Sequence, residues 1–524
     1  MSGSKLAILN ANVVTLDARR PRAEAIATQD GKIVAVGSNR QIRKHVDNTT
    51  KLIDAQGNMV VPGFADCHVH MTGFGQFLET LDLRNAGSIK EVQQKLRKHA
   101  QKSSRDGWIL GGRWDQERFS EKRYPTCWDL DAVVGDKPVL LSRVCGHIAV
   151  ANSKALQLAG ITGKTVVDSG KVDLDETTGE PNGILRENVI KLAWKAVPKP
   201  SQEEIKEACS SACEGAIKAG LTCVHWLLGS SSELRAIQKL HSEGKLPLRV
   251  CLGIPIERLD ELISIGLVTG FGNDMVKIGF VKILADGSLG GRTAALKEPY
   301  ADKPQTSGMM LYTQEKLNQL ISEANAADLQ IATHAIGDRT MEAVLNAYEK
   351  ALKEHPRKDH RHRIEHCSVL NPRLIKRMKR LDLIASVQPH FVFSDFWATD
   401  RVGKKRARWV YPFKSLLKEG LIVVSGSDCP VEPIDPVLGI WAAVARKSFP
   451  EESLTVEEAL KTYSLNSAYA SFDEDRRGTI EVGKFADFTI LSEDLSKIKP
   501  DEIRNVKVEM TIVDGKIVYS REPA

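Results

Sequence analysis

Two histidines, His68 and His70, end an apolar run rich in β-branched residues that begins at Val60. On a β-strand, residues i and i+2 point to the same face, so both imidazoles would aim at one point. Neutral imidazole is a common ligand of divalent metals such as zinc. An isolated HxH pair is more often incidental, so the interpretation depends on further ligands elsewhere in the chain.

Four more polar residues stand at the ends of apolar strand-like segments, and each has an ordinary structural explanation. Lys282 could extend its amine to solvent, and Asp428 could cap the following helix. His334 and His366 could each be a hydrogen-bonded core histidine. Six such groups, each on its own strand end apart from the HxH pair, are hard to explain together without a metal.

These side chains make a chemically sensible ligand set for two metal ions. One divalent ion would be bound by His68, His70 and Asp428, and a second by His334 and His366. Two ions about 3.5–4 Å apart need a bridging anion. The neutral amine of Lys282 can add carbon dioxide to give a carbamate, which is anionic and offers two oxygens, and flanking cations would stabilise it. We therefore expect two divalent ions and a carbamylated Lys282.

The elements that position these residues alternate between apolar strands and amphipathic helices over some four hundred residues. Such a rhythm implies a parallel sheet with helical crossovers, and a closed (β/α)8 TIM-like barrel fits the length. A capping box that begins at Thr455 predicts a late helix. The clearest helix–strand pairs are 202–219 with 222–225, 313–327 with 330–334, 372–381 with 384–387, and 412–419 with 422–426.

Both chain ends have a different texture of short strands and tight turns. Asp30-Gly31 is a strong hairpin signal. Neither end holds enough apolar residues for a stable sheet of its own, so we expect both to join in one small β-sandwich. The predicted domains are 1–61 and 476–524 for the sandwich and 62–475 for the barrel, with an insertion at about 71–200 on the barrel's C-terminal face, where barrel enzymes place their chemistry.

Composition is ordinary for a globular protein: 524 residues, 42% hydrophobic, 27% charged and a net charge of +6. Two basic clusters, at 376–380 and 404–408, are expected to be solvated helix faces or loops, so we expect no nucleic-acid partner. Nine scattered cysteines without a CxxC pair favour free thiols in a reducing compartment. The N-terminus lacks the pattern of a signal peptide, and no apolar run approaches a membrane span. We expect a cytoplasmic enzyme with no membrane partner.

Together these motifs resemble the amidohydrolase superfamily, and within it amidohydrolase family 3, which includes N-substituted formamide deformylases. The resemblance runs nearly end to end and is specific for fold and metal site, although not for substrate. The segments that carry it are 61–70 (VPGFADCHVH), 281–288 (VKILADGS), 333–338 (THAIGD), 363–367 (RIEHC), 426–430 (GSDCP) and 478–488 (GTIEVGKFADF).

The resemblance implies a metal-dependent amidohydrolase that cleaves a non-peptide C–N bond of an amide, formamide or cyclic amide. A hydroxide that bridges the metals would attack the carbonyl, with Asp428 as general base. Zinc suits histidine and carboxylate ligands, while iron, manganese or cobalt could serve. The family also suggests a homodimer. Three residues that could bind the small-molecule substrate or its oxyanion are His147, Arg292 and His390, although a loop-stabilising hydrogen bond explains each equally well.

Two alternatives stay open at this point. In a mononuclear, deaminase-like hydrolase of the same superfamily, His68, His70, His334 and Asp428 would hold one ion, His366 would orient the water, and Lys282 would stay an amine. A non-catalytic regulatory protein on the same scaffold would be expected to have lost ligands, and none is lost. Specificity would lie in the insertion and the loops, so the sequence does not name the substrate.

Overall fold

The computed structural model describes residues 5–101, 107–143, 148–168 and 170–521, and its largest sheet has eight strands that run parallel. Neighbouring strands follow one another along the chain, with crossovers between them, in the sheet order β21-β20-β19-β18-β17-β16-β15-β8. The strands are β8 (Phe64–Val69), β15 (Leu221–Leu227), β16 (Arg249–Pro255), β17 (Val276–Leu284), β18 (Gln330–Ala335), β19 (Arg363–His366), β20 (Ile384–Val387) and β21 (Val423–Ser425).

The two edges of this sheet meet just beyond the C-terminal ends of β8 and β21. The backbone N–H of Asp428 donates to the carbonyl of His68 at 2.7 Å, and the N–H of His70 donates to the carbonyl of Cys429 at 2.9 Å. These bonds bring the first and last strands together, so the sheet is a nearly closed barrel and the expected (β/α)8 barrel is confirmed.

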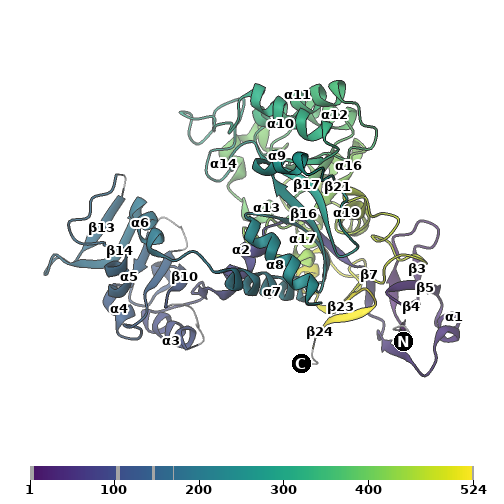
Figure 1. Cartoon of the computed structure of the whole chain (residues 1–524), viewed down its shortest axis with the longest axis horizontal. Coiled ribbons are helices and arrows are strands. Elements are labelled where there is room, and N and C mark those ends of the chain that lie inside the picture. The colour runs from purple at the N-terminus through teal and green to yellow at the C-terminus, as the bar shows by residue number, and fades with distance from the viewer. Residues whose placement is uncertain (1–4, 102–106, 144–147, 169, 522–524) are drawn as a thin grey trace. The chain divides into compact units, whose positions relative to one another are not determined.

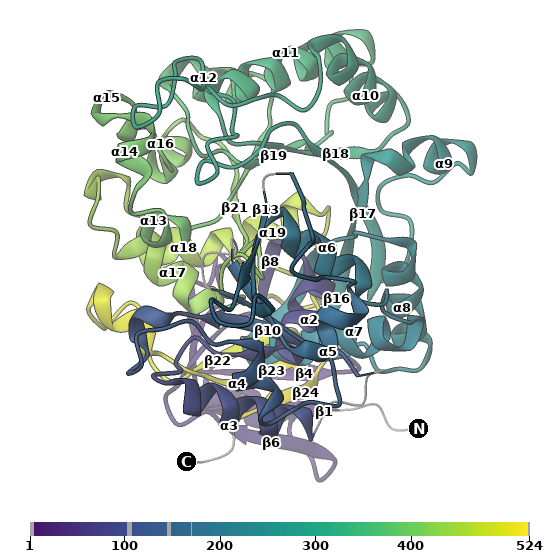
Figure 2. The same ribbon diagram turned by 90° about the vertical axis from the view of Figure 1, so that its left-hand side faces the viewer.

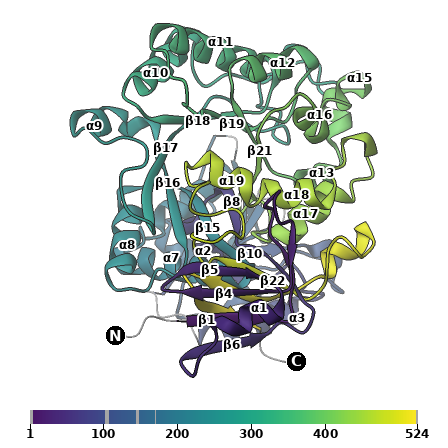
Figure 3. The same cartoon turned by 90° about the vertical axis from the view of Figure 1, so that its right-hand side faces the viewer.

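Helices cover the outer face of the barrel, and α10 to α12 lie outside β18 and β19 (Figures 2 and 3). Side-chain hydrogen bonds cap the first turn of several of these helices. The Thr313 hydroxyl caps α10, and α18 begins with the expected capping box at Thr455. From α7 onward, the helices between and after the strands are α7 (Gln202–Lys218), α8 (Ser231–Ser242), α9 (Leu259–Ser264), α10 (Gln314–Ala326), α11 (Asp338–Glu354), α12 (Pro372–Arg380), α13 (Phe391–Ser394), α14 (Ala398–Val402), α15 (Lys404–Ala407), α16 (Phe413–Lys418), α17 (Pro436–Val444), α18 (Val456–Thr462) and α19 (Leu465–Ala470).

The chain ends form two further sheets. One, of order β5-β4-β1-β6, comprises β1 (Lys5–Leu9), β4 (Ala25–Gln29), β5 (Lys32–Gly37) and β6 (Thr50–Asp54). The other, of order β24-β23-β22-β7-β2-β3, comprises β2 (Asn12–Val14), β3 (Arg22–Ala23), β7 (Met59–Pro62), β22 (Phe488–Leu491), β23 (Val508–Val513) and β24 (Lys516–Ser520).

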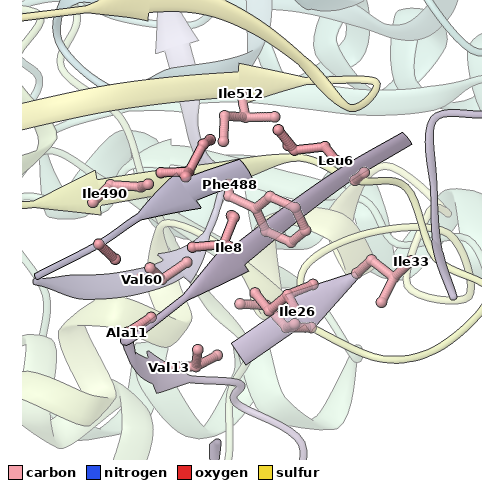
Figure 4. Packing of buried hydrophobic residues seen from close by; sticks show 14 of the residues in the cluster. Leu6, Ile8, Ala11, Val13, Ile26, Ile33, Val60, Phe488, Ile490 and Ile512 are labelled. Carbon is pink, nitrogen blue, oxygen red and sulfur yellow. The ribbon is translucent and has the colours of Figure 1, made fainter. Parts of the chain in front are cut away.

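Strand β22, from the C-terminal end of the chain, pairs antiparallel with β7 from the N-terminal end. One apolar cluster draws on both sheets: Ile8 and Ile26 from the first pack with Phe488 and Ile512 from the second, and all four side chains are buried (Figure 4). The two ends therefore share a sheet and a core. That they make a β-sandwich domain with the predicted limits stays a prediction.

Residues 75–208 form a second compact unit. It contains a six-stranded sheet of order β13-β14-β12-β11-β10-β9 with helices α3 to α6 (Figure 1). The stretch from Asp173 to Gly183, which reads as turn-rich in the sequence, belongs to the hairpin of β13 and β14. The elements are β9 (Leu81–Asp82), α3 (Ile89–Ala100), β10 (Ile109–Trp114), α4 (Cys127–Asp131), β11 (Val139–Arg143), β12 (Ile148–Ala151), α5 (Ser153–Leu158), β13 (Gly170–Leu174), β14 (Pro181–Glu187) and α6 (Asn188–Ala196).

Within the residues that the structure describes, no helix has both the length and the apolar character needed to cross a membrane.

Candidate metal centre

Three of the predicted ligands meet at the seam between β8 and β21. The ligand atoms of His68, His70 and Asp428 all lie within 4.8 Å of one another. The Oδ1 atom of Asp428 is 3.4 Å from Nε2 of His68 and 3.3 Å from Nε2 of His70. Two imidazole nitrogens and a carboxylate oxygen that converge in this way are a donor set suited to a divalent ion such as zinc.

The electrostatics of Asp428 agree with its place between the two imidazoles. Burial alone would raise its pKa, but the contacts with the imidazoles of His68 and His70 outweigh burial and hold the pKa well below its usual range. The carboxylate therefore stays ionised, which is the form that can bind a metal ion or accept a proton.

His334 and His366 lie next to this group, on the neighbouring strands β18 and β19. The rings of His334 and His366 are 4.4 Å apart between centroids, and those of His366 and His68 are 4.8 Å apart. Burial, together with the two neighbouring imidazoles, lowers the pKa of His366 well below its usual value. Its buried Nδ1 has no hydrogen-bond partner among the described residues. No hydrogen bond within the described residues therefore competes with a ligand at this nitrogen.

His334 is held from the side by the loop that follows β17. Its Nε2 lies 3.0 Å from the carbonyl of Gly287 and 3.2 Å from Oδ1 of Asp286. Asp286 is fixed in turn, because its carboxylate accepts the backbone N–H of Ile336 at 3.1 Å and that of Gly337 at 2.9 Å. The loop therefore orients the His334 ring.

Two of these residues adopt a backbone conformation that side chains with a Cβ rarely adopt. His366 has φ +74° and Asp428 has φ +59°. Such conformations cost free energy, on the order of 1–3 kcal/mol each, and they concentrate at functional sites. The two strained residues are thus candidate ligands, one at the C-terminal end of β19 and the other shortly after β21.

Lys282 lies within β17 and not beyond its end, because that strand continues to Leu284. The prediction that Lys282 ends the strand was therefore wrong by two residues, because the apolar run of β17 continues through Ile283 and Leu284. Its Nζ is buried and has no hydrogen-bond partner among the described residues. Burial lowers the pKa of Lys282 to about 8, although Glu365 and Asp428 oppose the shift. A substantial fraction of the amine is therefore neutral near pH 8.

Sequence reasoning missed a set of polar residues under these ligands, inside the barrel. Glu365 accepts a hydrogen bond from Nδ1 of His68. Arg363 donates to Oε1 of Glu365 at 2.9 Å and to Nδ1 of His225 at 2.7 Å, and all of these side chains are buried. The sequence did hold one indication of this set. Arg363 and Glu365 are two residues apart on β19, so their opposite charges must lie on the same, inward face of the strand.

The three residues predicted to touch substrate have different positions. His147 lies outside the described residues. Arg292 makes two hydrogen bonds to Asp302, at 3.1 and 2.8 Å. His390 is buried after β20, and burial lowers its pKa to about 4. Neither of its ring nitrogens has a partner among the described residues, and the same holds for both amide atoms of Gln388 two residues earlier.

The amino-acid sequence is similar to a known family and to known proteins over nearly its full length. The model of the amidohydrolase family matches residues 51–519. The Bacillus subtilis protein YtcJ, whose name places it among the amidohydrolases, is 38% identical over 95% of this chain and 96% of its own. The N-substituted formamide deformylase of Arthrobacter pascens is 27% identical over 98% of each chain.

A solved structure is similar over nearly the full length. It is an uncharacterised metal-dependent hydrolase from Pyrococcus furiosus, with a TM-score of 0.79 and 32% identity, covering 94% of this chain and 100% of the other. The similarity therefore extends through the barrel strands that carry the candidate ligands.

Proposed function

Because the chain belongs to the amidohydrolase family, we propose that this metal-dependent hydrolase cleaves a non-peptide C–N bond. The substrate is an amide, a formamide or a cyclic amide. The relative named as an N-substituted formamide deformylase, which is similar over 98% of each chain, supports this bond type. The observation that carries the proposal is the convergence of the His68, His70 and Asp428 ligand atoms within 4.8 Å.

The residues at this site fit a pair of divalent ions. A buried nitrogen without a partner costs about 1–3 kcal/mol, and both Nδ1 of His366 and Nζ of Lys282 are such atoms in the described chain. Coordination would remove that cost. His68, His70 and Asp428 would hold one ion and His334 and His366 the second. We propose zinc, since imidazole and carboxylate ligands suit it.

Lys282, as a carbamate, would supply the anionic ligand that a pair of divalent ions needs. Its neutral amine adds to carbon dioxide: a bond forms between Nζ and the carbon, one C–O π bond opens to place the negative charge on oxygen, and the nitrogen loses one proton to water. The product is an anionic carbamate with two oxygens. Support for this step comes from the burial of Nζ and its lack of a hydrogen-bond partner in the described structure.

When bound, such ions lower the pKa of a water molecule toward neutrality and polarise the substrate carbonyl. Asp428 acts as the general base: its ionised carboxylate takes a proton from the attacking water and returns it to the leaving nitrogen. His390 and Gln388 bind the polar part of the substrate through buried groups that have no partner in the described chain. We propose a lesser role for Arg292, because its guanidinium is already paired with Asp302.

The test combines metal analysis with a substrate panel. The full chain, purified with zinc, manganese, iron or cobalt, is analysed for metal content and assayed on N-substituted formamides, linear amides, lactams and cyclic ureides. We expect about two ions per chain and chelator-sensitive release of amine or opening of the ring. A fully metal-loaded chain that turns over no C–N substrate, or that hydrolyses only esters, would contradict the proposed bond type.

A further inference from the structure

A row of buried polar side chains crosses the barrel interior and ends at a proposed ligand. It starts at His225 on β15, passes through Arg363 and Glu365 on β19, and reaches His68 on β8. Arg363 donates from Nη1 to Nδ1 of His225 at 2.7 Å and from Nε to Oε1 of Glu365 at 2.9 Å. The other oxygen of Glu365, Oε2, contacts Nδ1 of His68. The row therefore connects three strands of the barrel.

The Glu365 carboxylate is held by hydrogen bonds at both of its oxygens. Its Oε2 accepts a second hydrogen bond, from the Ser386 hydroxyl at 2.7 Å, and the side chain has no exposed surface. Arg363, which binds the other oxygen, is itself anchored by a 2.7 Å bond from Nη2 to the carbonyl of Cys67, the residue before His68. Both carboxylate oxygens are thus bound by groups that are themselves on, or anchored to, neighbouring strands of the barrel.

The buried Glu365 carboxylate has a counter-charge beside it. The guanidinium of Arg363 lies against Oε1, with Nε 2.9 Å away, and both side chains are fully buried, so the two form an ion pair inside the barrel. An ionised carboxylate can only accept hydrogen bonds. In the neutral imidazole, the proton must therefore sit on Nδ1 of His68, and the lone pair must sit on Nε2.

Nε2 is the nitrogen that faces the seam, 3.4 Å from Oδ1 of Asp428. A metal-binding histidine needs its second nitrogen to be protonated and held, and a carboxylate is a frequent partner for that purpose. We propose that Glu365 is a positioning residue that selects this tautomer of His68 and holds its ring, while Arg363 and His225 keep Glu365 in place. This inference rests on the proposed function, since it concerns the same site.

A purely structural role for the Arg363–Glu365 pair makes different predictions. A buried ion pair that only supports the core would affect stability when broken, and it would leave the affinity for metal unchanged. A positioning role would affect the affinity for metal beyond any change in stability. The two roles therefore separate in a binding measurement on the folded protein.

Glu365→Gln is the informative substitution because its amide has only one oxygen. Arg363 carries a permanent positive charge and takes that oxygen, which turns the NH2 group toward Nδ1 of His68. The imidazole must then accept at Nδ1 and carry its proton on Nε2, so the lone pair no longer faces the metal site. We expect zinc to bind about 10–100-fold more weakly in this variant, measured by equilibrium competition with a chromophoric chelator on the full chain.

A second substitution tests the orientation directly. When Arg363→Met is added to Glu365→Gln, the oxygen of the introduced amide no longer has a cation to face and can turn to His68. We expect the double variant to recover several-fold in zinc affinity over the single variant, a rescue that a structural role would not produce. Should Glu365→Gln fail to fold, the apolar pair Arg363→Met with Glu365→Met removes both charges and the acceptor; it should bind zinc at least about tenfold more weakly than the natural chain.

The matched control is another buried pair at the opposite, N-terminal end of a barrel strand. Arg249 begins β16 and binds Asp487, with Nε and Oδ2 2.7 Å apart. Asp487→Asn also disturbs a buried Arg–carboxylate pair, so it should lower thermal stability while zinc affinity stays at the natural value.

The outcomes are distinct. Glu365→Gln that binds zinc as tightly as the natural chain, or a double variant no tighter than the single one, would overturn the inference. Where Glu365→Gln does not fold, natural affinity in the apolar pair would do the same. If the natural chain binds no zinc or other divalent ion, the proposed function fails instead.

Discussion

Asp428 and His68 are joined twice, once through the backbone and once through their side chains. The N–H of Asp428 donates to the carbonyl of His68 at 2.7 Å, and Oδ1 of Asp428 lies 3.4 Å from Nε2 of His68. The first contact closes the barrel between β21 and β8, and the second brings two candidate ligands together. The residues whose backbone contact closes the barrel are therefore also two of the candidate ligands.

Replacing Asp428 by Asn tests its role as general base. The variant keeps the backbone bond to His68 but loses the ionised carboxylate, so we expect kcat/KM to fall by about 10²–10⁴-fold. Asp435→Asn is the matched control, because Asn preserves the cap that Asp435 provides to α17, and its activity should be unchanged. Steady-state kinetics on an amide substrate decide the question, and activity near the natural level would remove Asp428 from the proposed chemistry.

Lys282→Met tests the proposed carbamate. Methionine keeps the apolar stem but cannot add carbon dioxide, so we expect loss of activity together with one of the two metal ions. Lys277→Met, on the same strand, removes an amine that pairs with Asp473 at 2.6 Å and should keep both ions. Metal analysis of both variants is the measurement. A full metal complement in Lys282→Met would argue against the bridge, and native mass spectrometry should find one added carbon dioxide in the natural chain alone.

Removal of metal should destabilise the fold as well as abolish activity. An ion that binds the native state alone stabilises it by RT ln(1 + [L]/Kd), which is about 2.7 kcal/mol when free metal is 100 times Kd. Thermal unfolding should therefore occur at lower temperature after dialysis against chelator and return to its original midpoint with added zinc. An unchanged midpoint, with metal analysis confirming its removal, would show that these residues hold no ion in the native state.

Gly426 should tolerate no side chain, because it lies in the seam. A Cβ at this position would meet the backbone nitrogen of His68 at 2.5 Å and Oδ1 of Asp66 at 2.8 Å. The His68 nitrogen belongs to the backbone of β8, and Oδ1 of Asp66 accepts the backbone N–H of Ser427 at 3.0 Å. A shift of either atom would disturb the seam, so Gly426→Ala should cost about 1–3 kcal/mol of stability and reduce activity. At Gly87 a Cβ would meet only the Glu91 carboxylate, 3.8 Å away, and Gly87→Ala should be neutral in chemical denaturation. Equal midpoints for the two variants would contradict this account of the seam.

The Arg249–Asp487 pair should contribute to stability without contributing to activity. It joins the start of β16 to the segment before β22, and the guanidinium also lies 3.7 Å from the centre of the Phe485 ring. Asp487→Ala removes the nearest carboxylate and leaves the buried guanidinium with Asp514, at 3.5 Å, and the carbonyl of Asp274. We therefore expect a loss of stability toward the lower end of about 3–5 kcal/mol in urea denaturation. Specific activity of the folded fraction should match that of the natural chain; a fall in activity without a fall in stability would show the opposite.

Much of the barrel could be predicted from local sequence because its strands and helices differ in periodicity. The strand Ile384–Val387 has the predicted limits, and the helix expected over 372–381 is α12 (Pro372–Arg380). The predicted position of Lys282 at a strand end was less accurate, because an apolar run alone does not show where β17 ends. Glu365 and Arg363 were quoted as part of a motif but given no role. Their spacing indicates that they share one face of β19, but it does not identify hydrogen-bond partners as distant in the sequence as His68 and His225.

The amino-acid sequence by itself determined which side chains stand at or near strand ends and, through the two-residue period of a strand, that His68 and His70 share a face. Only the tertiary structure decided which strands are neighbours, that β21 meets β8, and that the Glu365 carboxylate faces Nδ1 of His68. The physical reason is that spacing along one strand is set by the geometry of its own backbone. Contacts between strands depend on register and closure, which are set by packing of the whole barrel.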